Sequence, residues 1–90
     1  MDVHVHPRVR DRHPNISDDD MLAAWENCLR FKKRSGGAFN EYAAIGFDSN
    51  GRLLEMVAAQ QFDGSWLVFY AMTPPTRRML KELGLYEEKR

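Results

Sequence analysis

Two turn signals constrain the second half of the chain more than any other feature of the sequence. Asn50-Gly51 and Asp63-Gly64 are dipeptides typical of β-hairpin turns, and they separate three segments in which apolar residues alternate. The segments cover residues 41–48, 52–61 and 65–72. This spacing predicts a three-stranded antiparallel meander.

The turns also predict which side chains share a face of the meander. A two-residue turn pairs Ser49 with Arg52 in the first hairpin and Phe62 with Ser65 in the second. Because successive side chains of a strand point to opposite faces, these pairs assign every residue to one face. The expected core face consists of Ala43, Ile45, Phe47, Leu54, Met56, Ala58, Leu67, Phe69 and Ala71.

The opposite face of the predicted meander carries one acidic residue, Glu55. On this register Glu55 lies across from Met72 and diagonal to Tyr70, within reach of an aromatic or long side chain. The placement depends on the turns, because a turn that is longer by one residue moves a strand's side chains to the other face. The whole face comprises Tyr42, Ala44, Gly46, Glu55, Val57, Ala59, Trp66, Val68, Tyr70 and Met72.

A capping box gives the clearest helix start in the sequence. Ser17 is the expected N-cap, Asp20 can bond back to it, and Ile16 and Met21 fit a hydrophobic staple. The helix is expected over residues 18–30. Its expected buried side consists of Leu22, Trp25 and Leu29, with Met21 and Cys28 beside them.

Weaker signals predict the remaining elements. Residues 2–8 alternate weakly, which favours a short edge strand ended by Pro7. Residues 31–37 carry three consecutive cations and end in two glycines, so a basic loop is expected there. A second helix is expected to start near Pro75, capped by Thr73 or Thr76, and to stop at Gly84.

Length and composition bound the fold and its surroundings. Ninety residues make one α+β domain, 1–90, with a compact antiparallel sheet packed by an N-terminal and a C-terminal helix, and with 1–7 and 86–90 as candidate disordered tails. The 13 Lys and Arg residues balance 13 Asp and Glu residues, so the net charge offers no overall attraction to nucleic acid or anionic lipid. No apolar run resembles a signal peptide or membrane span, which predicts a cytoplasmic protein with no membrane partner.

Cofactor and covalent chemistry have little support in the sequence. His4 and His6 share one side of the predicted edge strand, but no third ligand accompanies them, so no metal and no cofactor are expected. The single cysteine, Cys28, excludes an internal disulfide and is expected to be a buried apolar residue. No nucleophile motif or phosphate-binding glycine pattern is present.

The remaining candidates suit acid-base chemistry on a phosphodiester. A carboxylate or histidine can take the proton of a 2′-hydroxyl, an arginine can stabilise the phosphorane charge, and an aromatic ring can stack a base. The alternative is structural: Glu55 pairs with a neighbouring arginine, and the Arg77-Arg78 pair is a solvated helix face. The residues considered for the chemistry are His13, Arg52, Glu55, Tyr70, Arg77, Arg78 and Lys81.

Several segments resemble one family of small proteins. His13-Pro14-Asn15-Ile16-Ser17, followed by acidic residues and Ala23-Ala24-Trp25, is similar to the opening of BrnT-type toxins of the DUF4258 group. Residues 44–48, 51–57 and 68–72 are similar to later segments of that family, so the resemblance covers roughly residues 8–85. Met72 stands where these toxins carry an arginine.

The resemblance implies a RelE-like fold and the role of endoribonuclease in a type II toxin-antitoxin pair. The implied partner is a small DNA-binding antitoxin, with a homodimer or a toxin-antitoxin hetero-oligomer both open. The matching positions for activity are His13, Arg52 and either Arg77 or Arg78.

Two function classes follow from the sequence. In the first, the chain is a metal-independent ribonuclease with RNA as its substrate; its catalytic candidates are His13, Arg52, Glu55, Tyr70 and Arg77, and its RNA contacts are Lys32, Lys33, Arg34, Arg78 and Lys81. In the second, the Glu55 face is a non-catalytic protein-binding surface on which Trp66 and Met72 receive a partner's apolar helix.

Overall fold

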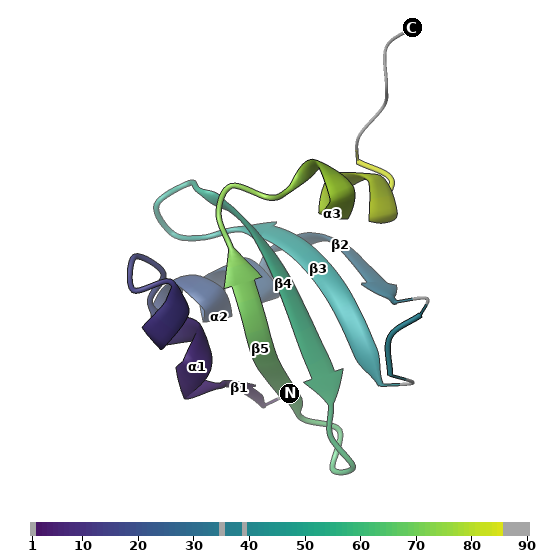
Figure 1. Ribbon diagram of the computed structural model, residues 1–90. Helices are drawn as coiled ribbons and strands as arrows, with labels where there is room; N and C mark the ends of the chain where they lie inside the picture. Colours follow the sequence, from purple (N-terminus) through teal and green to yellow (C-terminus); the bar gives the residue numbers. More distant parts are fainter. Residues whose placement is uncertain (1, 35, 39, 86–90) are drawn as a thin grey trace, which may run out of the picture.

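The chain forms a five-stranded mixed sheet with helices on both faces (Figure 1). The structure is a computed structural model and describes residues 2–34, 36–38 and 40–85. Within them the strand order is β1-β5-β4-β3-β2. The elements are β1 (Val3–Val5), α1 (Pro7–Arg12), α2 (Asp18–Glu26), β2 (Cys28–Lys33), β3 (Glu41–Phe47), β4 (Leu53–Gln60), β5 (Trp66–Met72) and α3 (Arg77–Glu82).

The expected meander is present and gains a strand at each side. β3, β4 and β5 pair antiparallel as predicted, and β2 adds a fourth antiparallel strand. The expected N-terminal edge strand is confirmed as β1, but it pairs parallel to β5, with Val3 beside Trp66. The sheet is therefore mixed, not purely antiparallel.

The β3–β4 turn is one residue longer than predicted. Asp48 pairs with Arg52 through a 2.9 Å backbone bond, and Gly51 has a positive φ of 79°. Asp48 stabilises this longer turn because one of its oxygens, Oδ1, accepts hydrogen bonds from the backbone N–H groups of Asn50 and Arg52. The predicted register of β3 was therefore wrong, and Ile45 pairs with Glu55.

The β4–β5 turn is also longer by one residue, but a bulge restores the predicted pairing. Gln61 bonds to Ser65 across the turn, and Asp63 accepts from the N–H and hydroxyl of Ser65. The register then shifts between Val57 and Ala58, which leaves Phe69 as the extra residue of β5. Beyond the bulge Glu55 pairs with Met72 as predicted.

Two apolar clusters, one on each face, hold the sheet between the helices. α1 and α2 cover the first, which contains Val9, Ile16, Met21, Ala24, Trp25, Ala44, Leu54, Met56, Ala58, Trp66, Val68 and Ala71. α3 covers the second, which contains Ala43, Ile45, Val57, Met79 and Leu83. The predicted core face therefore splits, because the longer first turn places Ala43 and Ile45 on the α3 side and leaves Phe47 44% exposed.

α2 ends earlier than predicted, and β2 occupies the expected helix end and basic loop. Gly46 of β3 runs against α2 so closely that a Cβ there would lie 2.0 Å from the carbonyl oxygen of Ala24. The ring of Phe31 then stacks on Tyr42, with centroids 5.0 Å apart. This packing favours a strand over helix continuation. Cys28 and Leu29 are exposed, so their predicted burial was wrong.

The two short helices begin at residues with capping side chains. α1 was missed: Pro7 occupies its first turn, and His6 Nδ1 accepts a hydrogen bond from the N–H of Arg8. α3 was predicted, and its N-cap is Thr76, whose hydroxyl accepts from the N–H of Met79. Gly84 follows α3 with a positive φ of 73°.

Arg52 joins the β3–β4 turn to α2. Its Nε and one terminal nitrogen lie 2.9 Å from carboxylate oxygens of Asp48 and Asp20, respectively. The other terminal nitrogen donates to the carbonyl oxygen of Asn15 at 3.0 Å. The Asp48 side chain is fully buried, so its charge depends on these partners.

Arg52→Gln should lower the free energy of unfolding by about 2–4 kcal/mol, because Asp48 would keep a buried charge without its cation. Urea denaturation of the purified variant measures this change. Arg30→Gln removes an exposed guanidinium from β2 and is the matched control, with an expected change within about 0.5 kcal/mol. Equal midpoints for Arg52→Gln and the wild type would contradict the structural role.

Asp48 should also make stability depend on acidity. Burial raises its pKa, but hydrogen bonds from Arg52 and Asn50 outweigh burial and hold the pKa below the ordinary 3.8. A carboxyl whose folded pKa is depressed stabilises the protein above its unfolded pKa of about 3.9, and this contribution is lost as the pH falls through the folded value. Urea midpoints should therefore fall less between about pH 6 and about pH 3 in Asp48→Asn than in the wild type. Parallel curves would refute the prediction.

Candidate functional site

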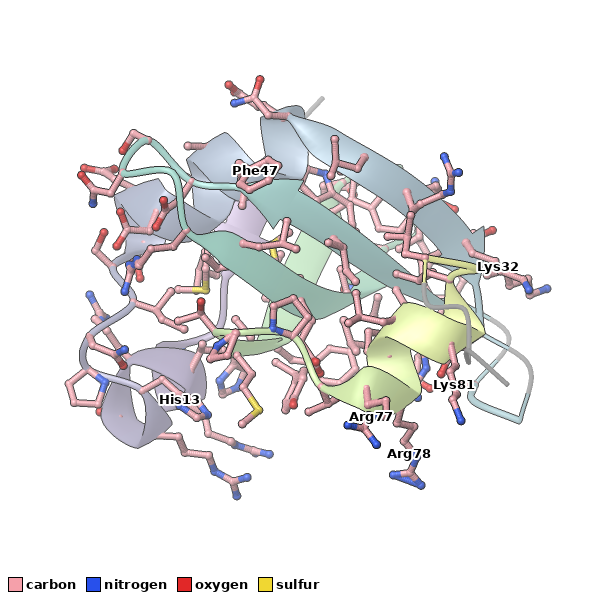
Figure 2. All side chains as sticks on the ribbon, turned by 90° about the horizontal axis from the view of Figure 1, so that it is seen from above. His13, Lys32, Phe47, Arg77, Arg78 and Lys81 are labelled. Atoms are coloured by element: carbon pink, nitrogen blue, oxygen red, sulfur yellow. The ribbon has the colours of Figure 1, made fainter. Side chains whose placement is uncertain are left out.

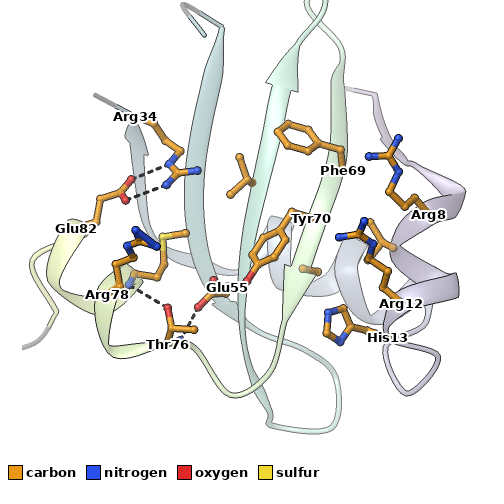
Figure 3. Close-up of a pocket in the computed structure, with 14 residues that line it drawn as sticks. Arg8, Arg12, His13, Arg34, Glu55, Phe69, Tyr70, Thr76, Arg78 and Glu82 are labelled. Carbon is orange, nitrogen blue, oxygen red and sulfur yellow. Dashed lines mark hydrogen bonds and ion pairs between the residues drawn. The ribbon is translucent and has the colours of Figure 1, made fainter. Parts of the chain in front are cut away.

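A pocket of about 610 Å³ opens beside the outer half of β5, between α1 and α3 (Figure 3). β1 pairs with β5 only from Trp66 to Val68, and the chain then turns away as α1. The part of β5 beyond the bulge therefore has a helix, not a strand, at its side. The pocket is lined by Arg8, Val9, Arg12, His13, Arg34, Glu55, Val57, Phe69, Tyr70, Ala71, Thr76, Arg78, Met79 and Glu82.

Three exposed arginines at the pocket have no partner for their charge in the described part of the chain. The guanidinium groups of Arg8, Arg12 and Arg78 make no ion pair or hydrogen bond with any residue there. Arg8 and Arg12 lie one helical turn apart in α1, where like charges repel. A bound anion would relieve this repulsion and satisfy several donors at once.

A fourth arginine at the pocket is neutralised. Arg34 donates two hydrogen bonds to Glu82 of α3, at 3.0 and 3.2 Å. The bond from Arg34 to Glu82 is the main cause that raises the pKa of Arg34. This pair fixes the end of β2 to α3, so it forms a wall of the pocket and leaves little free charge for a ligand.

Glu55 and Tyr70 form a linked pair at the base of the pocket. Glu55 is only 2% exposed, and its carboxylate accepts the N–H of Thr76 at the start of α3. Burial, followed by the hydrogen bond to Glu55, raises the pKa of Tyr70 to about 12. Tyr70 therefore stays protonated at neutral pH, and its hydroxyl donates a hydrogen bond to the Glu55 carboxylate. Because Glu55 is buried and engaged, it positions Tyr70 and α3.

His13 supplies an imidazole ring, a side chain that can accept a proton. It is the C-cap of α1 and is half-buried, and its ring has no hydrogen-bond partner within the described residues. Figure 3 shows His13 and Arg12 on the α1 side of the pocket, Arg78 on the α3 side and Tyr70 between them. A histidine that can accept a proton and arginines that can bind an anion thus meet in one cavity.

The structure brings some of the predicted site residues together and places others elsewhere. His13, Glu55, Tyr70, Arg34 and Arg78 line the pocket. Arg52 does not, because its guanidinium group binds Asp48 and Asp20 on the α2 side of the sheet. The other predicted residues outside the pocket lining are Lys32, Lys33, Trp66, Met72, Arg77 and Lys81.

The positions of these other residues explain their separation from the pocket. Arg77 and Lys81 share α3 with Arg78, and Lys32 lies on β2 at the end of the molecule away from His13 (Figure 2). Trp66 is 5% exposed and packs against Trp25, with ring centroids 5.3 Å apart, so it is not the exposed anchor that was expected.

Sequence reasoning missed Arg8 and Arg12 as site residues. Both lie in the basic stretch before α2, which carried no predicted helix. The available signal was Pro7 after a capping residue, which is typical of a helix start. A helix there places Arg8 and Arg12 on one face.

The ionisation of Tyr70 should depend on Glu55. Carbon-13 NMR of the tyrosine rings, assigned with Tyr70→Phe, should give Tyr70 a pKa of about 12, and Glu55→Gln should lower it toward the ordinary 10.0. A tyrosine with a raised folded pKa stabilises the fold below its unfolded value, and this contribution is lost as the pH rises through the folded value. An unchanged pKa in Glu55→Gln would show that the carboxylate does not hold the phenol.

Comparison with known proteins identifies no relative of this chain. No family model, curated protein or solved structure matches the chain. Within the described ranges, no helix is long and apolar enough to cross a membrane.

Proposed function

We propose that the pocket binds the phosphodiester backbone of RNA and that the chain is a metal-independent endoribonuclease. The observation that carries this proposal is the convergence of three arginines without charge partners, Arg8, Arg12 and Arg78, on a cavity that also holds His13 and Tyr70. Arginine side chains are well suited to phosphate because their donors form a planar fork. RNA brings both the phosphate and the 2′-hydroxyl that such a site can use.

The distribution of charge supports an anionic ligand although the whole chain has no net charge. Arg34 and Glu82 offset each other, and Glu55 is buried and hydrogen-bonded. The unpaired guanidinium groups therefore dominate the mouth of the pocket. Local positive charge in a concave site attracts phosphate at short range, and the attraction weakens with added salt.

Each group has a defined role in the proposed cleavage. His13 takes the proton of the 2′-hydroxyl, and that oxygen attacks the adjacent phosphorus. Arg12 and Arg78 stabilise the added negative charge on the phosphoryl oxygens, and Tyr70, whose hydroxyl is held by Glu55, forms the wall of the cavity between them. The bond from phosphorus to the 5′-oxygen breaks, that oxygen takes a proton from water, and the protonated His13 gives its proton to the hydroxide that remains. The products are a 2′,3′-cyclic phosphate and a free 5′-hydroxyl.

The sequence resemblance supports a type II toxin as the biological setting. We propose a RelE-like fold, a cytoplasmic location and a small DNA-binding antitoxin that inhibits the enzyme. The five-stranded sheet with helices on both faces is compatible with that fold. The non-catalytic alternative has less support, because Trp66, one of its two anchor residues, is buried.

His13→Asn and Arg12→Gln should each reduce cleavage of single-stranded RNA at least about tenfold, because proton transfer and charge stabilisation would be lost. Gel analysis of a labelled RNA, with ribosomes added in a parallel series, measures the rate, and growth after induced expression reports toxicity. Arg10→Gln changes an exposed arginine of the same helix that does not line the pocket, and it should cleave at the wild-type rate. Wild-type protein that leaves RNA intact in both series and does not arrest growth would exclude the proposal.

A further inference from the structure

We propose that a second cavity, at the opposite end of the sheet, binds one nucleotide of single-stranded RNA. The cavity measures about 570 Å³ and is lined by Lys33, Asn40, Tyr42, Gln60, Gln61, Phe62 and Gly64. None of these residues lines the first pocket, so the inference goes beyond the proposed cleavage site and does not require cleavage.

Tyr42 gives the second cavity a rigid aromatic wall. Its ring stacks on Phe31 at 5.0 Å with an interplanar angle of 6°, and the ring of Trp66 meets it edge-on at 5.1 Å. The backbone of Tyr42 is held in β3 between β2 and β4. A partly buried ring that is fixed in this way can stack a base with little loss of conformational entropy.

Phe62 supplies a second ring from the β4–β5 turn. It is a fully exposed large apolar residue, and its position at a hairpin tip imposes no packing need for an aromatic side chain. A base inserted beside Phe62 would remove this ring from water. Base-aromatic stacking tolerates any base, because every base has a π-face.

Three amide side chains lie beside the two rings and can read a base edge. Gln60 has no side-chain hydrogen bond to any described residue. Asn40 and Gln61 use their amide nitrogens to donate to the carbonyl oxygens of Gln60 and Ala59, which leaves their amide oxygens as acceptors. Amides offer both donors and acceptors, as the Watson–Crick edge of a base requires.

Lys33 completes a nucleotide-sized set of groups. It is exposed, and it makes no ion pair with the part of the chain that the structure describes. In a bound nucleotide, Lys33 would contact the phosphate, and the aromatic and amide side chains would contact the base. Because the bases of a duplex are stacked and paired, only a single strand can present a base to these side chains.

The proposal is tested by fluorescence anisotropy with a labelled single-stranded RNA octamer, in a His13→Asn background that prevents cleavage. Phe62→Ala should weaken binding at least about fivefold, since one stacking contact is lost. Phe47→Ala removes an exposed ring that lines neither cavity and should bind as the background does. Equal affinities for the two variants would overturn the proposal.

Charge gives an independent readout of the same site. Lys33→Gln should reduce the slope of log affinity against log salt by about 0.7, as expected when one phosphate contact to a single strand is lost. Arg30→Gln, which removes another exposed cation of β2 that lines neither cavity, should leave that slope unchanged. The duplex of the same sequence should show no loss on Phe62→Ala, and an equal loss would refute single-strand recognition. If the wild type does not cleave RNA but Phe62→Ala still weakens binding, the cleavage proposal is refuted and the nucleotide site stands.

Discussion

The ion-pair network around Arg52 determines how the two halves of the chain meet. Asp48 stabilises the longer β3–β4 turn through backbone N–H groups, and Arg52 connects this turn to Asp20 at the start of α2. Asp20 also completes the capping box with Ser17, so one set of contacts fixes a turn, a strand register and a helix start. The register places Glu55 on the α3 side of the sheet, where it accepts the N–H of Thr76. The hydrogen bond between Glu55 and Thr76 holds α3 against the sheet. Because α3 carries Arg78, this bond also positions one wall of the first pocket.

The sequence predicts the positions of the three meander strands more accurately than the residues that pair between them. Asn50-Gly51 and Asp63-Gly64 do mark the two turns, but dipeptide type alone does not distinguish a two-residue loop from a three-residue loop with glycine at positive φ. The side chains of Asp48 and Asp63 decide the longer form. Glu55 nevertheless faces Met72, because the extra residue in the second turn is offset by the bulge at Phe69.

The remaining errors arise from contacts between distant residues. The segment after Glu26 has no local helix stop, and its strand depends on Gly46 and on the aromatic packing of Phe31 against Tyr42 and Trp66. Arg52 was predicted to bind phosphate because it is an arginine. Its ion pairs with Asp48 and Asp20 depend on the folded arrangement of the turn and α2, which sequence spacing does not predict. His13, Tyr70 and Arg78 were each predicted as site residues. Their position in one pocket with Arg8 and Arg12 was not predicted, because it depends on α1 being a helix beside β5.

The outer edge of β2 has a consequence for how copies of this chain behave in solution. All six residues of the strand are exposed, and in the described chain β2 pairs only with β3. An unpaired strand edge is a template for joining another sheet. Arg30, Lys32 and Lys33 place positive charge along this edge, so two copies brought edge to edge would repel each other. These cations therefore disfavour edge-to-edge pairing of two β2 strands, independently of any ligand.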